Sequence, residues 1–234
     1  MKIKSELLAS FITKATLNGS IGSMVIKITD EGLSAQQKEL SNAGMTQAKL
    51  SLEKIKEKEN MELCIKNTPM LIKSLASFSG DIEIKKNTNI LSLLNAERQI
   101  DIVLSSEEFI DCNLSGLPEN LKNAFDKGFN ISSEPLKKIV SDMGIVESTS
   151  IVIEIKDKRL ILSTGEKGFD TISVKAVADY TDCSANYSEL LAKAINVIDG
   201  KINIALKKDF PIQLIEEADG IYCKYIVAPL VSKE

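Results

Sequence analysis

Apolar and polar residues alternate along two stretches of the chain, and each stretch folds back on itself across a short polar turn. The first runs from residue 24 to 37 around a turn at 30–32, and the second runs from 151 to 163 around a turn at 156–158. Successive side chains of a strand point to opposite faces of a sheet, so alternation at this period predicts half-buried strands. Each stretch is therefore expected to form a β-hairpin.

Other stretches carry apolar residues at the spacing of a helix. The four predicted helices lie at about 6–15, 68–78, 132–143 and 187–198. Thr68, followed by proline in the first turn, is expected to cap the second helix, and Ser132 or Ser133 the third. The predicted apolar faces consist of Leu7, Leu8, Phe11, Ile12 and Ala15; Leu71, Leu75 and Phe78; Leu136, Ile139, Val140 and Met143; and Tyr187, Leu190, Leu191, Ala194, Ile195 and Ile198.

The two halves of the chain repeat one order of elements. Gly80 and Gly200 each end a helical segment, where a left-handed residue is favoured, and an alternating strand follows each glycine. This order predicts two tandem copies of one α+β unit. Segment 111–124 is rich in Gly, Pro, Ser and Asn and has no periodicity, which is typical of a connector. It would separate an N-terminal domain, 1–110, from a C-terminal domain, 125–234, either as a plain linker or as a docking loop.

Composition excludes several kinds of catalytic and metal-binding site. The 234 residues include no histidine, which excludes histidine-based triads, general bases and metal sites. The sequence also lacks the glycine-rich motifs that bind phosphate or dinucleotides. Carboxylates are plentiful, so an enzyme is not excluded, but no pattern argues for one. We therefore expect a protein that is not an enzyme and that has neither a metal nor a cofactor.

Charge and cysteine usage indicate the cellular compartment and the possible partners of the protein. The four cysteines stand singly, which is typical of reduced, mostly buried thiols. Residues 1–4 alternate like a strand and not like a signal peptide, and no apolar run approaches the roughly 18 residues of a membrane helix. These features predict a protein of the cytoplasm or of a nucleus, with no membrane partner. A net charge of −4 means that binding to nucleic acid would require a segregated basic face.

A duplicated α+β unit with a long connector resembles the PCNA-type DNA sliding clamp of archaea and eukaryotes. Four segments match motifs of that family in order: Asp-Glu-Gly-Leu-Ser-Ala-Gln at 30–36, Leu-Ser-Gly-Leu-Pro-Glu at 114–119, Asp-Phe-Pro-Ile at 209–212 and Tyr-Ile-Val-Ala-Pro-Leu at 225–230. Two positions depart from the family. Asn42 or Gly44 stands where a basic residue, commonly histidine, is usual, and an apolar docking position aligns with either Lys38 or Leu40.

The resemblance implies an α+β fold of two tandem clamp domains, with helices lining the interior of a ring and antiparallel sheets outside. Such a protein encircles double-stranded DNA without sequence preference and tethers replication and repair enzymes. In each predicted helix the apolar stripe faces the sheet, and lysines occupy the opposite stripe. Those lysines either solvate an exposed helix face or contact DNA phosphates. The predicted DNA-binding residues are Lys14, Lys73, Lys137, Lys138 and Lys193.

The resemblance also implies client proteins and a subunit contact. DNA polymerase, ligase, nuclease and the clamp loader would bind through short peptides with aliphatic and aromatic anchors. The implied peptide-binding residues are Leu40, Leu114, Leu117, Pro118, Pro211, Val227, Ala228 and Pro229. A trimeric ring would close through edge strands at 100–104 and 171–175, whose expected interface residues are Ile100, Ile102, Leu104, Ile172 and Val174.

Other functions stay open at this point. The chain could be a specialised subunit of a heteromeric, checkpoint-like clamp, in which case it would fail to self-associate. It could also be a monomeric α+β enzyme or ligand-binding protein, which predicts a deep pocket with converging polar groups between the halves. A scaffold that never meets DNA is a third possibility. The sequence does not distinguish a homotrimer from a heterotrimer.

Overall fold

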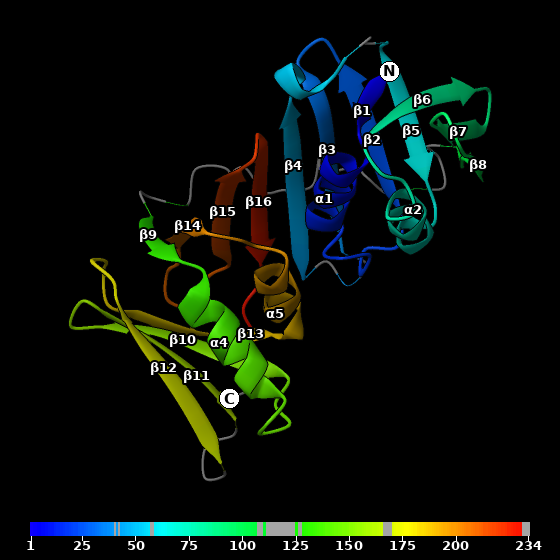
Figure 1. Ribbon diagram of the computed structural model, residues 1–234. Coiled ribbons are helices and arrows are strands. Elements are labelled where there is room, and N and C mark those ends of the chain that lie inside the picture. The colour runs from blue at the N-terminus through cyan, green and yellow to red at the C-terminus, as the bar shows by residue number, and fades with distance from the viewer. Residues whose placement is uncertain are drawn as a thin grey trace. The chain divides into compact units, whose positions relative to one another are not determined.

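The computed structural model describes residues 1–39, 41, 43–56, 59–106, 110, 125, 128–165 and 170–230 (Figure 1). The chain forms two compact units. Unit 1 comprises Met1–Leu40, Met45–Gly116 and Asp219–Cys223, and unit 2 comprises Ser41–Gly44, Leu117–Ala218 and Lys224–Glu234. The predicted connector, 111–124, lies outside the described residues, so the domain boundaries at 110 and 125 stay predictions.

Unit 1 combines two helices with antiparallel strands. Its helices are α1 (Ser5–Ala15) and α2 (Thr68–Leu75), which contact each other, and a short 3-10 helix covers Leu52–Lys54. One sheet has the strand order β1-β6-β7-β8, and the other strands of the unit follow the order β5-β2-β3-β4. The strands are β1 (Lys2–Lys4), β2 (Met24–Thr29), β3 (Gly32–Lys38), β4 (Gly44–Ser51), β5 (Met61–Ile65), β6 (Asp81–Asn87), β7 (Ile90–Leu94) and β8 (Gln99–Val103).

Unit 2 repeats this arrangement. Helices α4 (Glu134–Met143) and α5 (Glu189–Asn196) contact each other, and α4 packs on the sheet of order β12-β11-β10-β13. A second run of strands has the order β16-β15-β14-β9. The strands are β9 (Phe129–Ser132), β10 (Ser150–Lys156), β11 (Arg159–Gly165), β12 (Thr171–Val177), β13 (Cys183–Ser188), β14 (Lys201–Ala205), β15 (Ile212–Ala218) and β16 (Ile221–Val227).

The predicted hairpins are confirmed. Strands β2 and β3 pair across a two-residue turn, with Thr29 opposite Gly32. Strands β10 and β11 pair likewise across Asp157 and Lys158, whose φ angles of 51° and 59° are both left-handed. This is the backbone that a tight antiparallel turn requires, because its twist matches that of the flanking strands.

The left-handed backbone predicted at the two repeated glycines is also confirmed, since φ is 74° at Gly80 and 72° at Gly200. Both lie a few residues beyond the helices, which end at Leu75 and Asn196. In each unit the glycine therefore redirects the chain from the helix pair into the next strand, β6 or β14.

The prediction that Thr68 caps α2 is wrong. The side chain of Asn67 accepts a hydrogen bond from the N–H of Met70 at 3.0 Å and is the cap. The hydroxyl of Thr68 instead donates to the buried main-chain oxygen of Ile21 at 2.6 Å. At α4 it is Ser132 whose hydroxyl accepts from the N–H of Glu134, at 3.3 Å.

The helices bury most of their predicted apolar stripes, but Leu7 and Val140 are only half-buried, and Tyr187 lies on β13 and not on α5. Leu8, Phe11 and Ile12 of α1 and Leu71 and Leu75 of α2 lie in the core of unit 1. In unit 2 the buried stripe residues are Leu136, Ile139, Met143, Leu190, Leu191, Ala194 and Ile195. Cys64 and Cys223 are buried as well, whereas Cys183 is half-exposed and Cys112 lies outside the described residues.

Candidate functional site

Four of the five predicted DNA-binding lysines reach the surface of a helix. Lys73 in the last turn of α2 and Lys138 on α4 are exposed. Lys137 and Lys193 are half-exposed. The predicted exposed position of Lys14 is wrong, because this residue of α1 is only 6 % exposed. We therefore leave Lys14 out of any phosphate-binding surface.

Two of these lysines already have acidic partners. Lys137 Nζ lies 2.6 Å from Asp199 Oδ1, and Lys193 Nζ lies 3.0 Å from Glu189 Oε1, one helical turn away. Exposed ion pairs of this kind contribute about 0–1 kcal/mol, so a phosphate group could take the place of either carboxylate. The four helices of the described chain carry five lysines and four acidic residues, which leaves them nearly neutral.

Tyr187 joins three segments of unit 2 that are distant in sequence. It lies on β13, its main chain pairs with Pro229, and its hydroxyl donates to the main-chain oxygen of Phe210 at 3.1 Å. Burial, together with the nearby Cys183 and Asp209, raises the pKa of the Tyr187 phenol, which keeps it a donor. The ring of Phe210 meets that of Phe125 edge-on, with centroids 5.8 Å apart. The loop that holds Pro211 is thereby fixed beside the C-terminal segment.

The C-terminal segment leaves β16 in an extended form. Ala228 donates its N–H to the oxygen of Ala43 and Leu230 donates to that of Asn186, both at 2.7 Å. Val227 is buried, Ala228 and Pro229 are half-exposed, and Leu230 is 46 % exposed.

The structure thus brings together four of the predicted peptide-binding residues, Pro211, Val227, Ala228 and Pro229. Leu40, Leu114, Leu117 and Pro118 lie outside the described residues. Sequence reasoning missed Leu230, although its place directly after the Ala-Pro pair was a usable signal.

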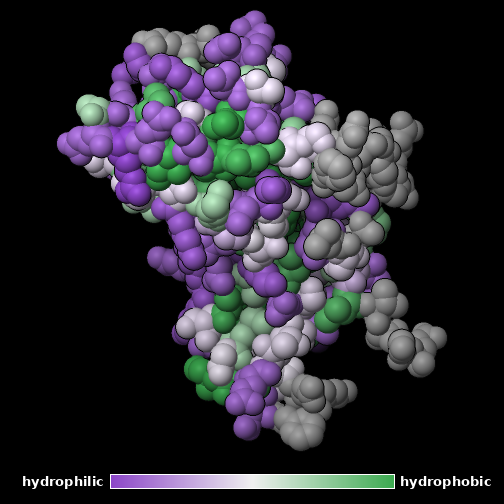
Figure 2. Space-filling model, turned by 90° about the vertical axis from the view of Figure 1, so that its right-hand side faces the viewer, coloured by the Kyte–Doolittle hydropathy of each residue, from purple (hydrophilic) through white to green (hydrophobic). Residues whose placement is uncertain are grey.

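Both strands predicted to form the subunit contact lie at the edge of a sheet in the described part of the chain, β8 in unit 1 and β12 in unit 2. Ile100, Ile172 and Val174 are half-exposed, whereas Ile102 and Leu104 are buried within their own unit. The large exposed side chains, which the prediction missed, are Val103 at 56 % and Val177 at 83 %. Figure 2 shows hydrophobic residues gathered on the side of unit 1 that carries β6–β8, bordered by hydrophilic ones.

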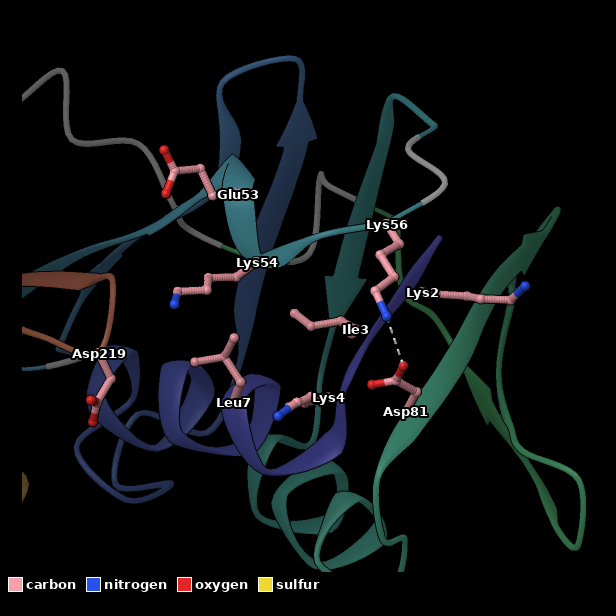
Figure 3. Close-up of a pocket in the computed structure, with 9 residues that line it drawn as sticks. All are labelled: Lys2, Ile3, Lys4, Leu7, Glu53, Lys54, Lys56, Asp81 and Asp219. Atoms are coloured by element: carbon pink, nitrogen blue, oxygen red, sulfur yellow. Dashed lines mark hydrogen bonds and ion pairs between the residues drawn. The ribbon is translucent and has the colours of Figure 1, made fainter.

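Unit 1 also has a pocket of about 360 Å³ near the start of α1 (Figure 3). Its lining residues are Lys2, Ile3, Lys4, Leu7, Glu53, Lys54, Lys56, Asp81 and Asp219. In the close-up the Lys56 amine points at the Asp81 carboxylate, 3.2 Å away, while Ile3 and Leu7 lie between the charged side chains. Within the described residues no group of three acidic or cysteine side chains could hold a metal ion. The pocket supplies no recognisable set of catalytic groups.

Two units, each with a helix pair packed against antiparallel sheet, define the duplicated α+β architecture of DNA sliding clamps. The chain has the PCNA-type clamp fold over its full length. It superimposes on A. fulgidus PCNA, solved with the C-terminal region of FEN-1 bound, with a TM-score of 0.82 and 14 % identity, covering 100 % of this chain and 98 % of that one. The PCNA of Entamoeba histolytica gives a TM-score of 0.79 and 17 % identity, covering 98 % of each chain.

No protein-family model and no curated protein matches the sequence. The similarity to known proteins therefore lies in the fold and not in the amino-acid sequence. Within the described residues, no helix is both long and apolar enough to cross a membrane.

Proposed function

We propose that the protein is a DNA sliding clamp, a ring that encircles duplex DNA and tethers replication and repair enzymes without catalysing a reaction itself. The observation that carries this proposal is the match of the whole chain to A. fulgidus PCNA, from end to end. A duplicated unit of helices and sheets has no need of the histidine, metal or nucleotide motifs that this sequence lacks.

In this proposal the helix lysines meet the DNA. Lys73, Lys137, Lys138 and Lys193 would contact phosphates as flexible point charges, which carry no base readout and therefore permit sliding. Each phosphate that is neutralised adds roughly 0.9 to the slope of log affinity against log salt. Because the helices are nearly neutral overall, we expect a shallow slope, and topology, not affinity, would keep the ring on DNA.

Client enzymes would dock on unit 2. Pro211, Ala228, Pro229 and Leu230 offer a partly exposed apolar surface that Tyr187 holds in place, and aliphatic or aromatic anchors of a short peptide would fit it. In A. fulgidus PCNA the bound partner is the C-terminal region of FEN-1. We infer that a polymerase, a ligase, a nuclease and the clamp loader would use the same surface here. The ring would then work wherever the cell keeps its DNA, in the cytoplasm with the nucleoid or in a nucleus.

The test has two stages. Light scattering across a dilution series should give three times the 25.6 kDa mass of one chain. The ring should then be retained on closed circular DNA after loading and be released when the DNA is cut. Lys73→Glu with Lys193→Glu should fold and assemble normally but stimulate a polymerase poorly at moderate salt. Lys156→Glu on β10, outside the helices, is the matched control. Normal stimulation by the double variant would remove the helix lysines from the proposal.

A second candidate, a specialised subunit of a heteromeric clamp, is favoured by the small net charge of the helices. In that case sister chains would supply most of the basic residues around the DNA. A persistent monomer that gains mass only when such chains are added would support it.

A further inference from the structure

The helix lysines of the two units differ in their partners, although the units repeat one fold. Lys73 of α2 and Lys193 of α5 occupy equivalent positions, because they lie equally far before the repeated glycine of their unit. Glu189 stands four residues before Lys193, and its Oε1 is 3.0 Å from the lysine amine. The residue four before Lys73 is a proline. Lys193 is therefore paired, whereas Lys73 has no ion-pair partner among the residues that the structure describes.

The corner that contains the repeated glycine differs in the same way. In each unit the oxygen of this glycine accepts a main-chain N–H at the start of a helix, from Ser5 at 2.9 Å in unit 1 and from Ser133 at 2.7 Å in unit 2. The same corner is therefore bonded to α1 in one unit and to α4 in the other. The residue before the glycine is Ser79 in unit 1 and Asp199 in unit 2. Unit 2 thus carries a carboxylate where unit 1 carries a hydroxyl.

The main chain on both sides of Asp199 is fixed. Its N–H donates to Oε1 of Glu216 at 2.6 Å, and Glu216 is only 1 % exposed. The next residue, Gly200, is bonded to Ser133, which lies one helical turn before Lys137. The Asp199 carboxylate consequently reaches the Lys137 amine, 2.6 Å away, from a backbone that is already ordered. This arrangement reduces the entropy cost that usually weakens an exposed ion pair.

The next lysine of α4 has no such partner. Lys138 is exposed and makes no ion pair within the described part of the chain. Lys137 and Lys138 have the same charge and lie on one helix, but a carboxylate occupies the amine of Lys137. A paired amine binds a phosphate only by exchanging one anion for another, so it adds less attraction for DNA than an unpaired amine.

We propose that Asp199 and Glu189 compete with DNA phosphates for Lys137 and Lys193, so that these amines contact the DNA backbone only in exchange for a carboxylate. The lysines without a described partner, on α2 and at position 138, supply the permanent attraction. Each exchanged contact is short-lived, because the carboxylate recaptures the amine when the phosphate moves past. The competition rests on the proposed clamp function and adds to it the residues that limit the grip on DNA.

Uncharged amides of the same size test the competition. Asp199→Asn and Glu189→Gln should each raise the affinity for a short fluorescent DNA duplex by up to about fivefold at low salt, which is the range that an exposed ion pair allows. The slope of log affinity against log salt should steepen by up to about 0.9 for each change. Asp157→Asn removes the same charge at the turn between β10 and β11 and should change neither quantity. Fluorescence anisotropy across a salt series measures both.

A double-mutant comparison separates competition from a general change of charge. In the wild type, Lys138→Gln should flatten the salt slope by about 0.9, and Lys137→Gln should flatten it by much less. In the Asp199→Asn background, Lys137→Gln should flatten it by the full amount of about 0.9. An equal effect of Lys137→Gln in both backgrounds overturns the competition, because the two residues would then act independently. Urea denaturation verifies that each variant is folded.

The outcomes also separate the competition from the clamp function. Duplex binding that neither amide strengthens overturns the competition, while retention on closed circular DNA would still support the clamp. Tighter binding by the amides in a protein that circular DNA does not retain supports the competition and overturns the clamp. If neither the wild type nor any variant binds the duplex at the lowest salt, these lysines do not meet phosphates and the competition is overturned.

Discussion

The hydroxyl of Tyr187 donates a hydrogen bond to the main-chain oxygen of Phe210 at 3.1 Å. Through this bond β13 holds the loop before β15, and the main chain of the same tyrosine pairs with Pro229. One buried residue thus positions both sides of the proposed peptide-binding surface, one through its side chain and the other through its main chain.

Replacing Tyr187 with phenylalanine should lower the free energy of unfolding by about 1 kcal/mol, because the buried oxygen of Phe210 loses its donor. Urea denaturation measures this loss. An unchanged midpoint for Tyr187→Phe would mean that the bond contributes nothing to stability.

The same bond predicts a pH dependence. Burial raises the pKa of Tyr187 above the ordinary value of 10.0 for a phenol. A group whose pKa is raised in the folded state stabilises the protein fully below its unfolded pKa, and that stability is lost as the pH rises towards the folded pKa. Between about pH 9 and pH 11 the wild type should therefore lose more unfolding free energy than Tyr187→Phe. Parallel losses in the two proteins would contradict this.

At α2, Asn67→Ala should destabilise unit 1 by about 1 kcal/mol, because the N–H of Met70 loses its acceptor. Ser133 occupies the equivalent position before α4 but makes no side-chain capping bond. Ser133→Ala should therefore destabilise the protein less than Asn67→Ala. Thermal unfolding of the two variants measures the difference. Equal effects would mean that the cap at Asn67 is not what stabilises α2.

Gly128 is packed against β14. A Cβ there would lie 2.4 Å from the main-chain oxygen of Ile204 and 2.4 Å from Asn203 Oδ1. Gly128→Ala should therefore destabilise unit 2 by about 1–3 kcal/mol, as overpacking does. Gly22→Ala is the control, because a Cβ at Gly22 meets no atom within 4 Å. Similar melting temperatures for the two variants would contradict the close packing.

Leu230→Asp should leave folding intact, since this side chain is 46 % exposed, yet reduce the affinity for a client peptide about tenfold or more through the loss of apolar area. Isothermal titration with the C-terminal peptide of a nuclease measures the affinity. Ile145→Asp, at a side chain that is 71 % exposed and lies after α4, is the control. Equal binding by all three proteins would place the docking surface elsewhere.

The spacing of hydrophobic residues and the residue types at the turns were enough to predict the hairpins and the tandem α+β units. The alternation at 24–29 and 151–155 has one physical solution, a strand with one face buried. The apolar stripe of α1 was equally clear from Leu8, Phe11 and Ile12. Such signals are local, and they report only which face of an element is buried.

Features that depend on a neighbouring segment could not be predicted in this way. Lys14 stands at the border of the α1 stripe, and its burial depends on what packs beside the helix. Thr68 has the chemistry of a cap, but its hydroxyl is bound to Ile21, more than forty residues earlier. Val103 and Val177 occupy positions that are otherwise polar in the alternating pattern of their strands. The prediction therefore placed the subunit contact on the apolar positions between them.

If the predicted contact between β8 and β12 closes the proposed ring, these two unlike edges have a genetic consequence. A copy whose β12 edge has been disabled would still present an intact β8, so it would join one normal neighbour and then stop the assembly there. In a cell that makes both forms, each such copy would remove normal subunits from use. Variants of β12 would therefore be dominant over the normal gene, whereas variants that merely unfold the chain would be recessive.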